Sequence, residues 1–225
     1  MSDGEIRCEN LVKTYSIGQP NEFTALKGLN VTINGGAFTS IIGPSGSGKS
    51  TLLNLISCLD TPTKGEVYIE GISISSLSDF EKAKLRREKL GFVFQQFNLI
   101  KNMTTYENIE LPMRFKGTPA GQRKKRINEL LDLVGLTEKA GNKPTELSGG
   151  QQQRVAVARS LANAPKIILA DEPTGNLAST TGKMILELLM RLNKEENRTL
   201  VIVTHDPNIA KITDRKIRIQ DGQIT

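Results

Sequence analysis

Short apolar segments alternate along this chain with longer segments that mix apolar and charged residues, as strands and helices do. The apolar segments end in polar residues or glycine, which is typical of strands. They predict strands at 38–42, 65–71, 90–95, 166–172 and 199–204. Two longer strands are expected ahead of them, at 6–17 and 24–33, and a strand with a turn closes the chain at 215–225.

The segments between these strands predict helices. In 119–134 the apolar residues recur at helical spacing on one face, and Gly135 is the expected stop. Ser78 and Ser148 are capping residues at the starts of two others. Helices are expected at 78–89, 104–114, 119–134, 148–163 and 181–193. No strand is expected between 96 and 164, so this stretch predicts a helical subdomain inserted into a sheet protein.

A glycine-rich loop follows the expected strand at 38–42. The segment Gly43–Thr51 reads GPSGSGKST and fits G-x-x-x-x-G-K-[S/T], and Leu52–Ile56 behind it has the apolar content of a helix start. Strand, glycine loop and helix are the context that this pattern requires. The alternative is a glycine-rich turn that binds nothing, but the register of the pattern and its flanking segments favour a phosphate site.

The residue types in this loop suit phosphate binding. Glycine at Gly43, Gly46 and Gly48 allows positive φ and lets backbone N–H groups approach an anion closely. The helix that begins near Lys49 adds the positive end of its dipole. Lys49 is expected to reach the outer phosphates, and the Ser50 hydroxyl to ligate Mg²⁺.

Two acids end the expected strand at 166–172. A strand places Asp171 and Glu172 on opposite faces, so Asp171 is expected to hold Mg²⁺ while Glu172 polarises a water beside the γ-phosphate. Two carboxylates at the end of an apolar strand are costly without a cation or polar partners nearby. The pattern therefore favours a functional role for both.

Two further polar residues follow expected strands, at the carboxyl edge where open α/β sheets bind ligands. Gln95 is expected to touch the metal or the attacking water, although a glutamine that merely starts a loop has the same pattern. His205 is the only histidine. A lone histidine is more often structural, but its place at this edge predicts a contact with the γ-phosphate.

A second helix start in the chain has the character of an anion site. The segment Leu147–Arg154 reads LSGGQQQR, with Ser148 as a capping residue and two glycines that expose backbone N–H groups. One nucleotide cannot easily reach both helix starts within one chain. Two chains arranged head to tail would bring them together. An ordinary capped helix remains the alternative.

Composition and charge limit the classes of function. The formal charge is +6, with basic clusters at 82–89 and 123–126. Nucleic acid or an anionic membrane surface would suit such clusters, as would solvated helix faces. Aromatic residues are only 4% and tryptophan is absent, which disfavours base-stacking platforms.

The cysteine pattern and the N-terminus indicate a cytoplasmic protein. Cys8 and Cys58 are far apart in sequence and form no C-x-x-C pair, as expected of a reduced protein. No apolar run approaches the length of a bilayer span, and residues 1–5 have no export-signal character. We therefore expect no direct membrane insertion.

The set of motifs resembles the ATPase subunit of an ABC transporter over nearly all 225 residues. Gly43–Thr51 resembles its Walker A motif, Leu147–Gln151 its signature, and Ile167–Glu172 its Walker B motif. Gln95 stands at the Q-loop, His205 at the switch histidine, and Tyr15 at the aromatic that stacks on adenine. The runs GFVFQQFNLI, ENIELP and DEPTGNL are most similar to the macrolide-export and lipoprotein-release branch.

The resemblance implies a P-loop NTPase of the α/β class. Its mostly parallel sheet core (1–95 and 160–225) would carry an antiparallel β subdomain and a helical subdomain (about 96–160), within a single ATPase domain. The implied nucleotide contacts are Tyr15, Gly43, Ser45, Gly46, Ser47, Gly48, Lys49, Ser50, Thr51, Ser148, Gly149, Gly150 and Gln151. The implied Mg²⁺ ligands are Ser50, Gln95 and Asp171, and the catalytic residues are Glu172, His205 and Gln95.

The same resemblance implies partners. Two subunits would close around two Mg·ATP, and the Q-loop region would pass the motion to a membrane-spanning permease at the cytoplasmic face. No nucleic acid is expected. The alternative is a chromosome-maintenance or DNA-repair ATPase of the same architecture, but long coiled coils and zinc modules have no counterpart here. A regulatory module that binds ATP without hydrolysing it is a third possibility.

One position departs from the family pattern. An aspartate usually follows Gly-x-Leu in the loop behind Walker B and reaches across the dimer, but this chain has Ala178 there. We expect nucleotide binding to survive this change, and communication between the two sites, or commitment to hydrolysis, to be weaker. The intact Lys49, Glu172 and His205 argue against a purely regulatory module.

Overall fold

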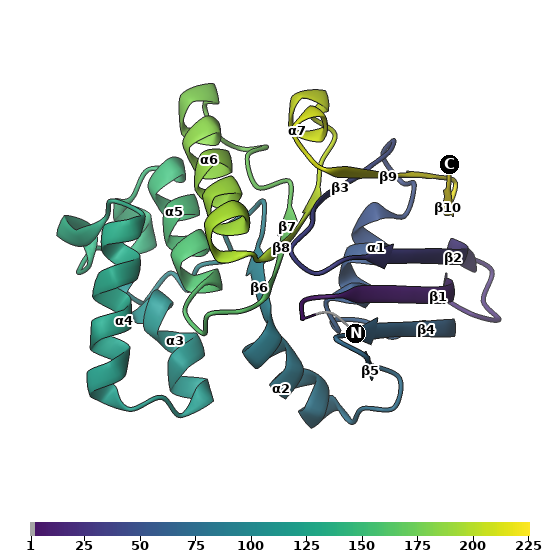
Figure 1. Ribbon diagram of the computed structural model, residues 1–225, viewed down its shortest axis with the longest axis horizontal. Helices are drawn as coiled ribbons and strands as arrows, with labels where there is room; N and C mark the ends of the chain where they lie inside the picture. The colour runs from purple at the N-terminus through teal and green to yellow at the C-terminus, as the bar shows by residue number, and fades with distance from the viewer. Residues whose placement is uncertain (1–2) are drawn as a thin grey trace.

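The computed structural model describes residues 3–225, apart from the side chain of Ser179. A central sheet separates a β-rich end from a helical end (Figure 1). The strands are β1 Ile6–Tyr15, β2 Phe23–Ile33, β3 Phe38–Ile42, β4 Lys64–Ile69, β5 Ile72–Ser73, β6 Leu90–Val93, β7 Ile167–Asp171, β8 Thr199–Val203, β9 Arg215–Gln220 and β10 Gln223–Ile224. The helices are α1 Lys49–Ile56, α2 Asp79–Lys89, α3 Thr105–Lys116, α4 Ala120–Leu133, α5 Gly149–Ser160, α6 Ser179–Glu196 and α7 Pro207–Lys211, with short 3₁₀ turns at Thr137–Lys139 and Pro144–Glu146.

The central sheet has six strands in the order β10-β9-β3-β8-β7-β6, and every neighbouring pair except β10 with β9 is parallel. Alternate residues of its strands enter different cores. In β7, Leu169 packs into the core on the α1 side, while Ile168 and Ala170 pack into the core that includes α5 and α6. Burial on both faces explains why these strands are continuous apolar runs in the sequence.

The second sheet is antiparallel, with the order β2-β1-β4-β5. Helix α1 contributes Leu52, Leu55 and Ile56 to a core shared by both sheets. Cys8 and Cys58 are buried free thiols in the same core. Burial raises the pKa of Cys8 to about 12 and of Cys58 to about 11, so both are poor nucleophiles at neutral pH.

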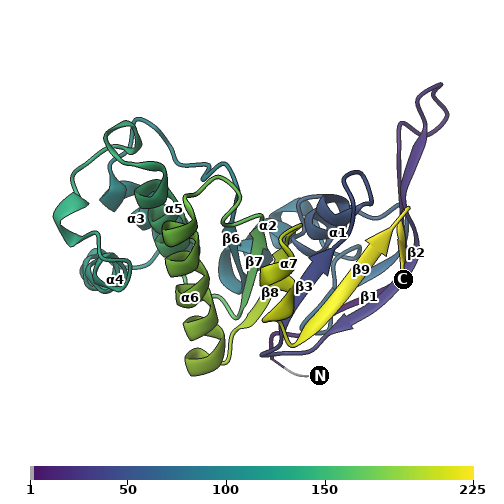
Figure 2. The same cartoon turned by 90° about the horizontal axis from the view of Figure 1, so that it is seen from above.

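The helical end consists of α3, α4 and α5, and α6 lies alongside α5 (Figures 1 and 2). In the described chain no strand lies between β6 and β7, so these helices form an insertion in the sheet order. The predicted fold class is confirmed: a mostly parallel core carries an antiparallel β subdomain and a helical insertion. The subdomain boundaries near 96 and 160 stay a prediction.

Several element ends differ from those predicted. Strand β6 ends at Val93, two residues before Gln95, and β7 ends at Asp171. The predicted caps at Ser78 and Ser148 are confirmed, each with a capping box. The short β5 and α7 were not expected, although Asp206-Pro207 is a typical helix start and the Asp206 side chain does cap α7.

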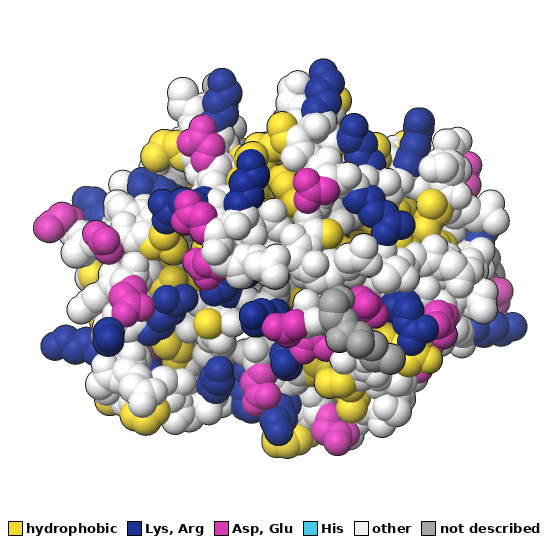
Figure 3. Space-filling model, viewed as in Figure 1, with side chains coloured by type: hydrophobic (Ala, Val, Ile, Leu, Met, Phe, Trp, Pro, Cys, Tyr) yellow, Lys and Arg dark blue, Asp and Glu magenta, His cyan; other side chains and the backbone are white. Residues whose placement is uncertain are grey.

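The basic clusters lie on charged helix faces. Acids pair with Lys82 and Lys89 of the first cluster and with Arg123 and Arg126 of the second. Figure 3 shows both signs of charge intermixed over the face that it views. These pairs favour the interpretation as solvated helix faces. Within residues 3–225, no helix is both long enough and apolar enough to span a membrane.

Candidate nucleotide site

The glycine-rich loop turns sharply between β3 and α1. A Cβ at Gly43 would lie 2.0 Å from the carbonyl oxygen of Ile219, and one at Gly48, where φ is 105°, would lie 2.7 Å from the carbonyl oxygen of Ala25. Both positions therefore require glycine. Gly48 is the N-cap residue of α1, and because glycine has no side chain it leaves the N–H groups at the helix start uncapped.

The loop residues themselves have the character of an anion site. Lys49 Nζ donates to the carbonyl oxygens of Gly43 (2.9 Å) and Pro44 (2.7 Å), so its charge faces neutral acceptors. The buried hydroxyl of Ser47 has no hydrogen-bond partner in the described structure. The Lys49 charge at a helix start suits a phosphate group, whereas the predicted contact residue Ser47 has its hydroxyl buried and does not line the cavity beside this loop.

A cavity of about 410 Å³ opens above this loop. Its volume is in the range of small-ligand sites. The predicted residues that line it are Gly43, Ser45, Gly46, Gly48, Lys49, Ser50, Thr51, Gln95, Asp171, Glu172 and His205. Residues from four separate parts of the sequence therefore meet in one cavity, at the carboxyl edge of the sheet.

Asp171 and Glu172 line this cavity together. The prediction that they lie on opposite faces is wrong, because the strand ends at Asp171 and Glu172 has a left-handed φ of 43°. Burial raises the pKa of Asp171, and the neighbouring Glu172 carboxylate adds to the rise, while Lys49 opposes it. Burial and a neighbouring negative charge both disfavour the ionised form of this carboxyl group, and a bound cation would stabilise that form.

Backbone and side-chain contacts hold Glu172 in this unusual conformation. Its N–H donates to the carbonyl oxygen of Val203 at 2.9 Å. Its carboxylate accepts from the His205 N–H at 2.9 Å and the Thr204 hydroxyl at 3.3 Å, and lies 2.6 Å from His205 Nδ1. The ends of β7 and β8 thus place the acid and the histidine in direct contact.

Gln95 lies in the loop after β6 and reaches the loop after β7. Its Nε2 donates to Asn176 Oδ1 at 3.4 Å, and Asn176 Nδ2 donates to the Gln95 carbonyl oxygen at 3.1 Å. A Cβ at Gly175 would lie 3.1 Å from Gln95 Nε2, which leaves little room between these loops. The two loops are therefore in direct contact beside the cavity.

The helix start at Ser148 does not line the cavity. Ser148, Gly149, Gly150 and Gln151 belong to the start of α5, where Ser148 and Gln151 form a capping box. Ser148 and Gly149 are exposed, and a Cβ at Gly150 would lie 2.4 Å from a methyl carbon of Thr181 on α6. The two predicted anion sites of this chain are therefore separate.

The residues present also fit a magnesium ion. Ser50, Gln95 and Asp171 offer hydroxyl, amide and carboxylate oxygens to the cavity, and hard oxygen donors are what Mg²⁺ prefers. In the part of the chain that the structure describes, no cluster of three His, Cys, Asp or Glu side chains could hold a metal. A magnesium site here would therefore use mixed oxygen donors and the nucleotide's own phosphates.

The aromatic part of the site differs from the prediction. The Tyr15 hydroxyl donates to Asp60 Oδ2 at 3.0 Å, and Tyr15 is not among the cavity residues. Phe23 and Ala25 line the cavity instead, and both were missed. Phe23 is the cross-strand partner of Tyr15, so the pairing of the first two strands is the signal that would have found it.

The glycine loop, the sheet edge and the paired acids define a nucleoside triphosphatase of the P-loop class. A family model described as "ABC transporter" matches residues 26–175. The chain belongs to this family, and it is the ATP-binding subunit of an ABC transporter, an ATPase.

Characterised and uncharacterised relatives are similar over most of the chain. An uncharacterised ABC transporter ATP-binding protein of Methanocaldococcus jannaschii, MJ0796, is 55% identical over 97% of this chain and 94% of its own length. A dimeric structure of MJ0796 in a post-hydrolysis state, bound to ADP and Pi, matches with a TM-score of 0.90 and 52% identity, covering 97% of this chain and 96% of that one.

The macrolide export ATP-binding/permease protein MacB of Neisseria meningitidis is 46% identical over 97% of this chain. The match covers only 34% of MacB. This chain therefore corresponds to about a third of that longer protein.

The raised pKa of Asp171 predicts a pH-dependent stability. Because the pKa of Asp171 is higher in the folded state, its stabilising contribution to the free energy of unfolding is fully present below its pKa in the unfolded chain, about 3.9. That contribution is lost as the pH rises through the pKa of the folded state. Asp171→Asn should therefore raise the melting temperature without nucleotide or Mg²⁺ at pH 7, and the gain should shrink towards pH 4.

Thermal melts of both proteins between pH 4 and pH 8 measure this effect. The exposed Asp132→Asn provides the matched control and should change the melting temperature little at any pH in this range. A lower melting temperature for Asp171→Asn at pH 7 would contradict the prediction.

Proposed function

We propose that two copies of this chain close head to tail around two Mg·ATP molecules and drive export or extraction of a substrate by a membrane-spanning permease. One observation carries this proposal. A single cavity contains the phosphate loop, Gln95, both acids and His205, whereas the helix start at Ser148–Gly150, where Ser148 and Gly149 are exposed, lies outside it. A second copy can bring its Ser148 helix start to the phosphates.

Structural relatives support the dimer and the transporter partner. The similar structures of MJ0796 are described as dimeric, one of them with ADP and Pi. Another structural relative, cbiO1 of Clostridium perfringens, is described as part of the ABC transporter complex cbiONQ. A self-associating subunit with a transporter partner is consistent with both.

In this proposal different residues of the chain bind the phosphates, accept the proton and hold the metal ion. Lys49 and the backbone of the loop bind the outer phosphates, and His205 contacts the γ-phosphate. Glu172 accepts a proton from the attacking water, since it lies at the cavity wall beside His205. Ser50, Gln95 and Asp171 would hold Mg²⁺, which neutralises phosphate charge when it is bound.

Glu172→Gln tests the assignment of the base. Phosphate release should fall by about 10²- to 10⁴-fold, because the amide cannot accept the proton. Nucleotide binding should survive, and an ATP-bound dimer should accumulate, since the buried charge near the γ-phosphate is removed. Phosphate release and size-exclusion chromatography with light scattering measure the two effects.

If Glu172→Gln hydrolysed ATP at the wild-type rate, another residue would have to be the general base. His205 would then be the first to examine, because its ring contacts the same part of the cavity. If Glu172→Gln bound no ATP at all, the defect would lie in binding and the base assignment would be wrong.

Ala178 affects two properties, the stability of α6 and the contact across the dimer, and Ala178→Asp tests both. Ala178 is the N-cap residue of α6 and makes no side-chain capping bond. Ala178→Asp should therefore raise the free energy of unfolding without nucleotide by about 0.5–2 kcal/mol, measured by urea denaturation. If it also restores a contact across the dimer, ATPase rate, cooperativity or dimer affinity should rise as well.

Ala178→Gly is a matched control for the stability effect, because glycine also caps helices without a carboxylate. Unchanged rate, cooperativity and dimer affinity in Ala178→Asp would contradict the idea that the missing carboxylate weakens communication. An unchanged unfolding free energy would contradict the capping argument.

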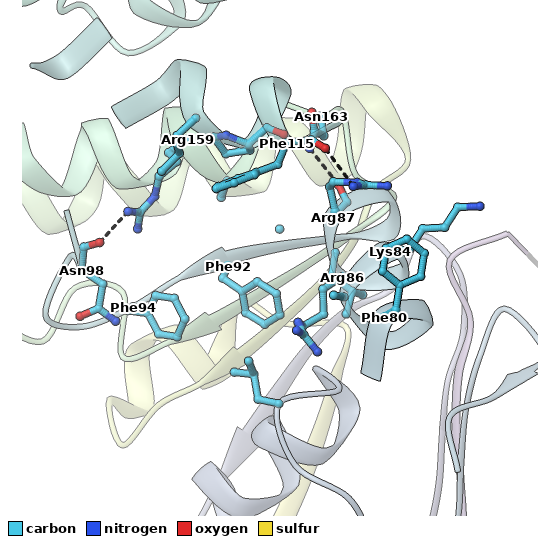
Figure 4. A pocket seen from close by; sticks show the side chains of 17 residues that line it. Phe80, Lys84, Arg86, Arg87, Phe92, Phe94, Asn98, Phe115, Arg159 and Asn163 are labelled. Atoms are coloured by element: carbon cyan, nitrogen blue, oxygen red, sulfur yellow. Dashed lines mark hydrogen bonds between the residues drawn. The ribbon is translucent and has the colours of Figure 1, made fainter. Parts of the chain in front are cut away.

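A second cavity, the docking groove, is suited to the permease. It has a volume of about 560 Å³ and lies between α2, β6 and the helical end (Figure 4). Its apolar lining includes Phe80, Phe92, Phe94 and Phe115, and the rings of Phe92 and Phe94 stack at 5.8 Å. Phe80 and Phe115 are 75% and 69% exposed, so an apolar partner would remove much aromatic surface from water.

The positive charge of the groove indicates which side chains a partner needs. Lys84, Arg86, Arg87 and Arg159 line it, and none of the described residues that line it is acidic. Arg159 donates to the carbonyl oxygens of Asn98 (2.6 Å) and Phe97 (2.9 Å), and burial lowers its pKa. Such a groove favours a cytoplasmic segment of the permease that carries both apolar and acidic side chains.

Capture from membranes tests the partner. Tagged Glu172→Gln protein with Mg·ATP should recover a multi-span membrane protein from detergent-solubilised membranes of the source cells. Lys84→Glu should abolish this recovery, because the exposed Lys84 lines the groove and the substitution reverses its charge. Lys124→Glu on α4, also exposed but outside the groove, should leave it intact.

Recovery of DNA or of soluble protein alone would contradict a membrane-spanning partner. Recovery that survives Lys84→Glu would place the contact elsewhere on the surface. In the proposal, the subunit lies at the cytoplasmic face of the membrane through this partner.

A further inference from the structure

A third cavity, the α7–β9 groove, adjoins the nucleotide cavity. It has a volume of about 610 Å³ and is lined by residues of α7, of β9 and of the loop after β3, with α7 and β9 both drawn in yellow in Figure 1. Gly43 and His205 line both cavities, so the groove begins at a wall of the nucleotide cavity. At this wall the Glu172 carboxylate lies 2.6 Å from His205 Nδ1. The groove therefore starts beside the acid that is proposed as the general base.

Three cations from two elements line the groove. Lys216 and Arg218 are alternate residues of β9 and share one face of the strand, because Ile217 and Ile219 enter the core on its other face. Lys211 is the last residue of α7. All three cations are exposed, and within residues 3–225 none of their side chains has an ion pair or a hydrogen bond. They are therefore free to bind an anion.

The two sides of the shared wall differ in charge. Asp171 and Glu172 line the nucleotide cavity, and Lys49 is the one lysine or arginine among the described residues beside them. In the groove the only carboxylate of the described lining residues is Asp206, whose side chain caps α7. Two carboxylates and one lysine thus face three cations and one carboxylate. This arrangement attracts an anion from the nucleotide cavity into the groove.

The lining of the groove suits a small inorganic anion better than a second nucleotide. No Phe, Tyr or Trp is among the described residues that line it, so a base would have no ring to stack on. The ammonium and guanidinium groups are donors that bind phosphate oxygens. Inorganic phosphate is the anion that ATP hydrolysis produces in the neighbouring cavity.

We propose that the α7–β9 groove is the route by which inorganic phosphate leaves the nucleotide cavity, and that Lys211, Lys216 and Arg218 bind it on the way out. This inference rests on the proposed function, because the phosphate must form beside Glu172 and His205. After hydrolysis ADP stays on the phosphate loop, and the phosphate anion moves past His205 toward the cations. Their attraction lowers the barrier to this step.

Two rates within a single turnover test this route. In Lys216→Gln/Arg218→Gln the cleavage of bound ATP, measured by acid quench, should change less than about 2-fold, because both side chains are exposed and outside the nucleotide cavity. Release of phosphate into solution, followed with a fluorescent phosphate-binding protein, should be about 3- to 30-fold slower, because most of the attracting charge is removed. Added salt should reduce this difference, because it screens the remaining attraction.

Phosphate binding can also be measured without turnover. Inorganic phosphate is titrated with the ADP-bound protein, and the width of its phosphorus NMR resonance is followed. The wild-type protein should broaden the resonance, and Lys216→Gln/Arg218→Gln should broaden it much less, because two of the three cations of the groove are lost. Equal broadening by both proteins would contradict binding in the groove.

Lys124→Gln/Lys125→Gln on α4 is the matched control, since it removes the same charge from two exposed lysines that line neither cavity. It should leave cleavage, release and phosphate binding unchanged. Equal release rates in wild type and Lys216→Gln/Arg218→Gln would overturn the inference. So would equal slowing of cleavage and release, which would indicate a distorted phosphate loop. A wild-type protein that formed no phosphate from ATP would contradict the proposed function itself.

Discussion

The parallel pairing of β3, β8, β7 and β6 is the constraint on which the site depends. Because these strands run in one direction, the loops that follow them leave at one edge and bring Lys49, Gln95 and His205 to one cavity. Both faces of the sheet are buried, so a slip of one residue in register would exchange the two cores. Packing on both sides therefore fixes the position of each strand end and of its polar residue.

At these strand ends the site combines electrostatic repulsion between carboxylates with a strained backbone conformation. Asp171 and Glu172 share the cavity with one lysine, and the Lys49 ammonium faces carbonyl oxygens of its own loop. Glu172 also has a left-handed φ of 43°, which is costly for a residue with a Cβ. In the proposed function, a ligand that carries both phosphate and a divalent cation would offset the two charge costs together, although not the backbone cost.

Sequence patterns predicted the strands of the core, the helix caps at Ser78 and Ser148, and most of the residues that line the cavity. Local signals carry this information, since apolar runs, glycine spacing and capping residues are short-range features. They did not predict that Glu172 turns back beside Asp171, because a hydrogen bond to Val203 of another strand sets its φ. Phe23 was missed for the same reason, since its role depends on pairing with β1.

The loop after β7 contacts residues that lead to both the nucleotide cavity and the docking groove. On one side Asn176 exchanges hydrogen bonds with Gln95, whose loop continues to Asn98 in the docking groove. On the other side the buried Gln153 of α5 donates to the Pro173 carbonyl oxygen at 2.6 Å. A shift of the helical end must therefore move or break contacts with the loop that begins at Glu172. Any coupling between the docking groove and Glu172 would need no longer path than these two contacts, both of which act on one short loop.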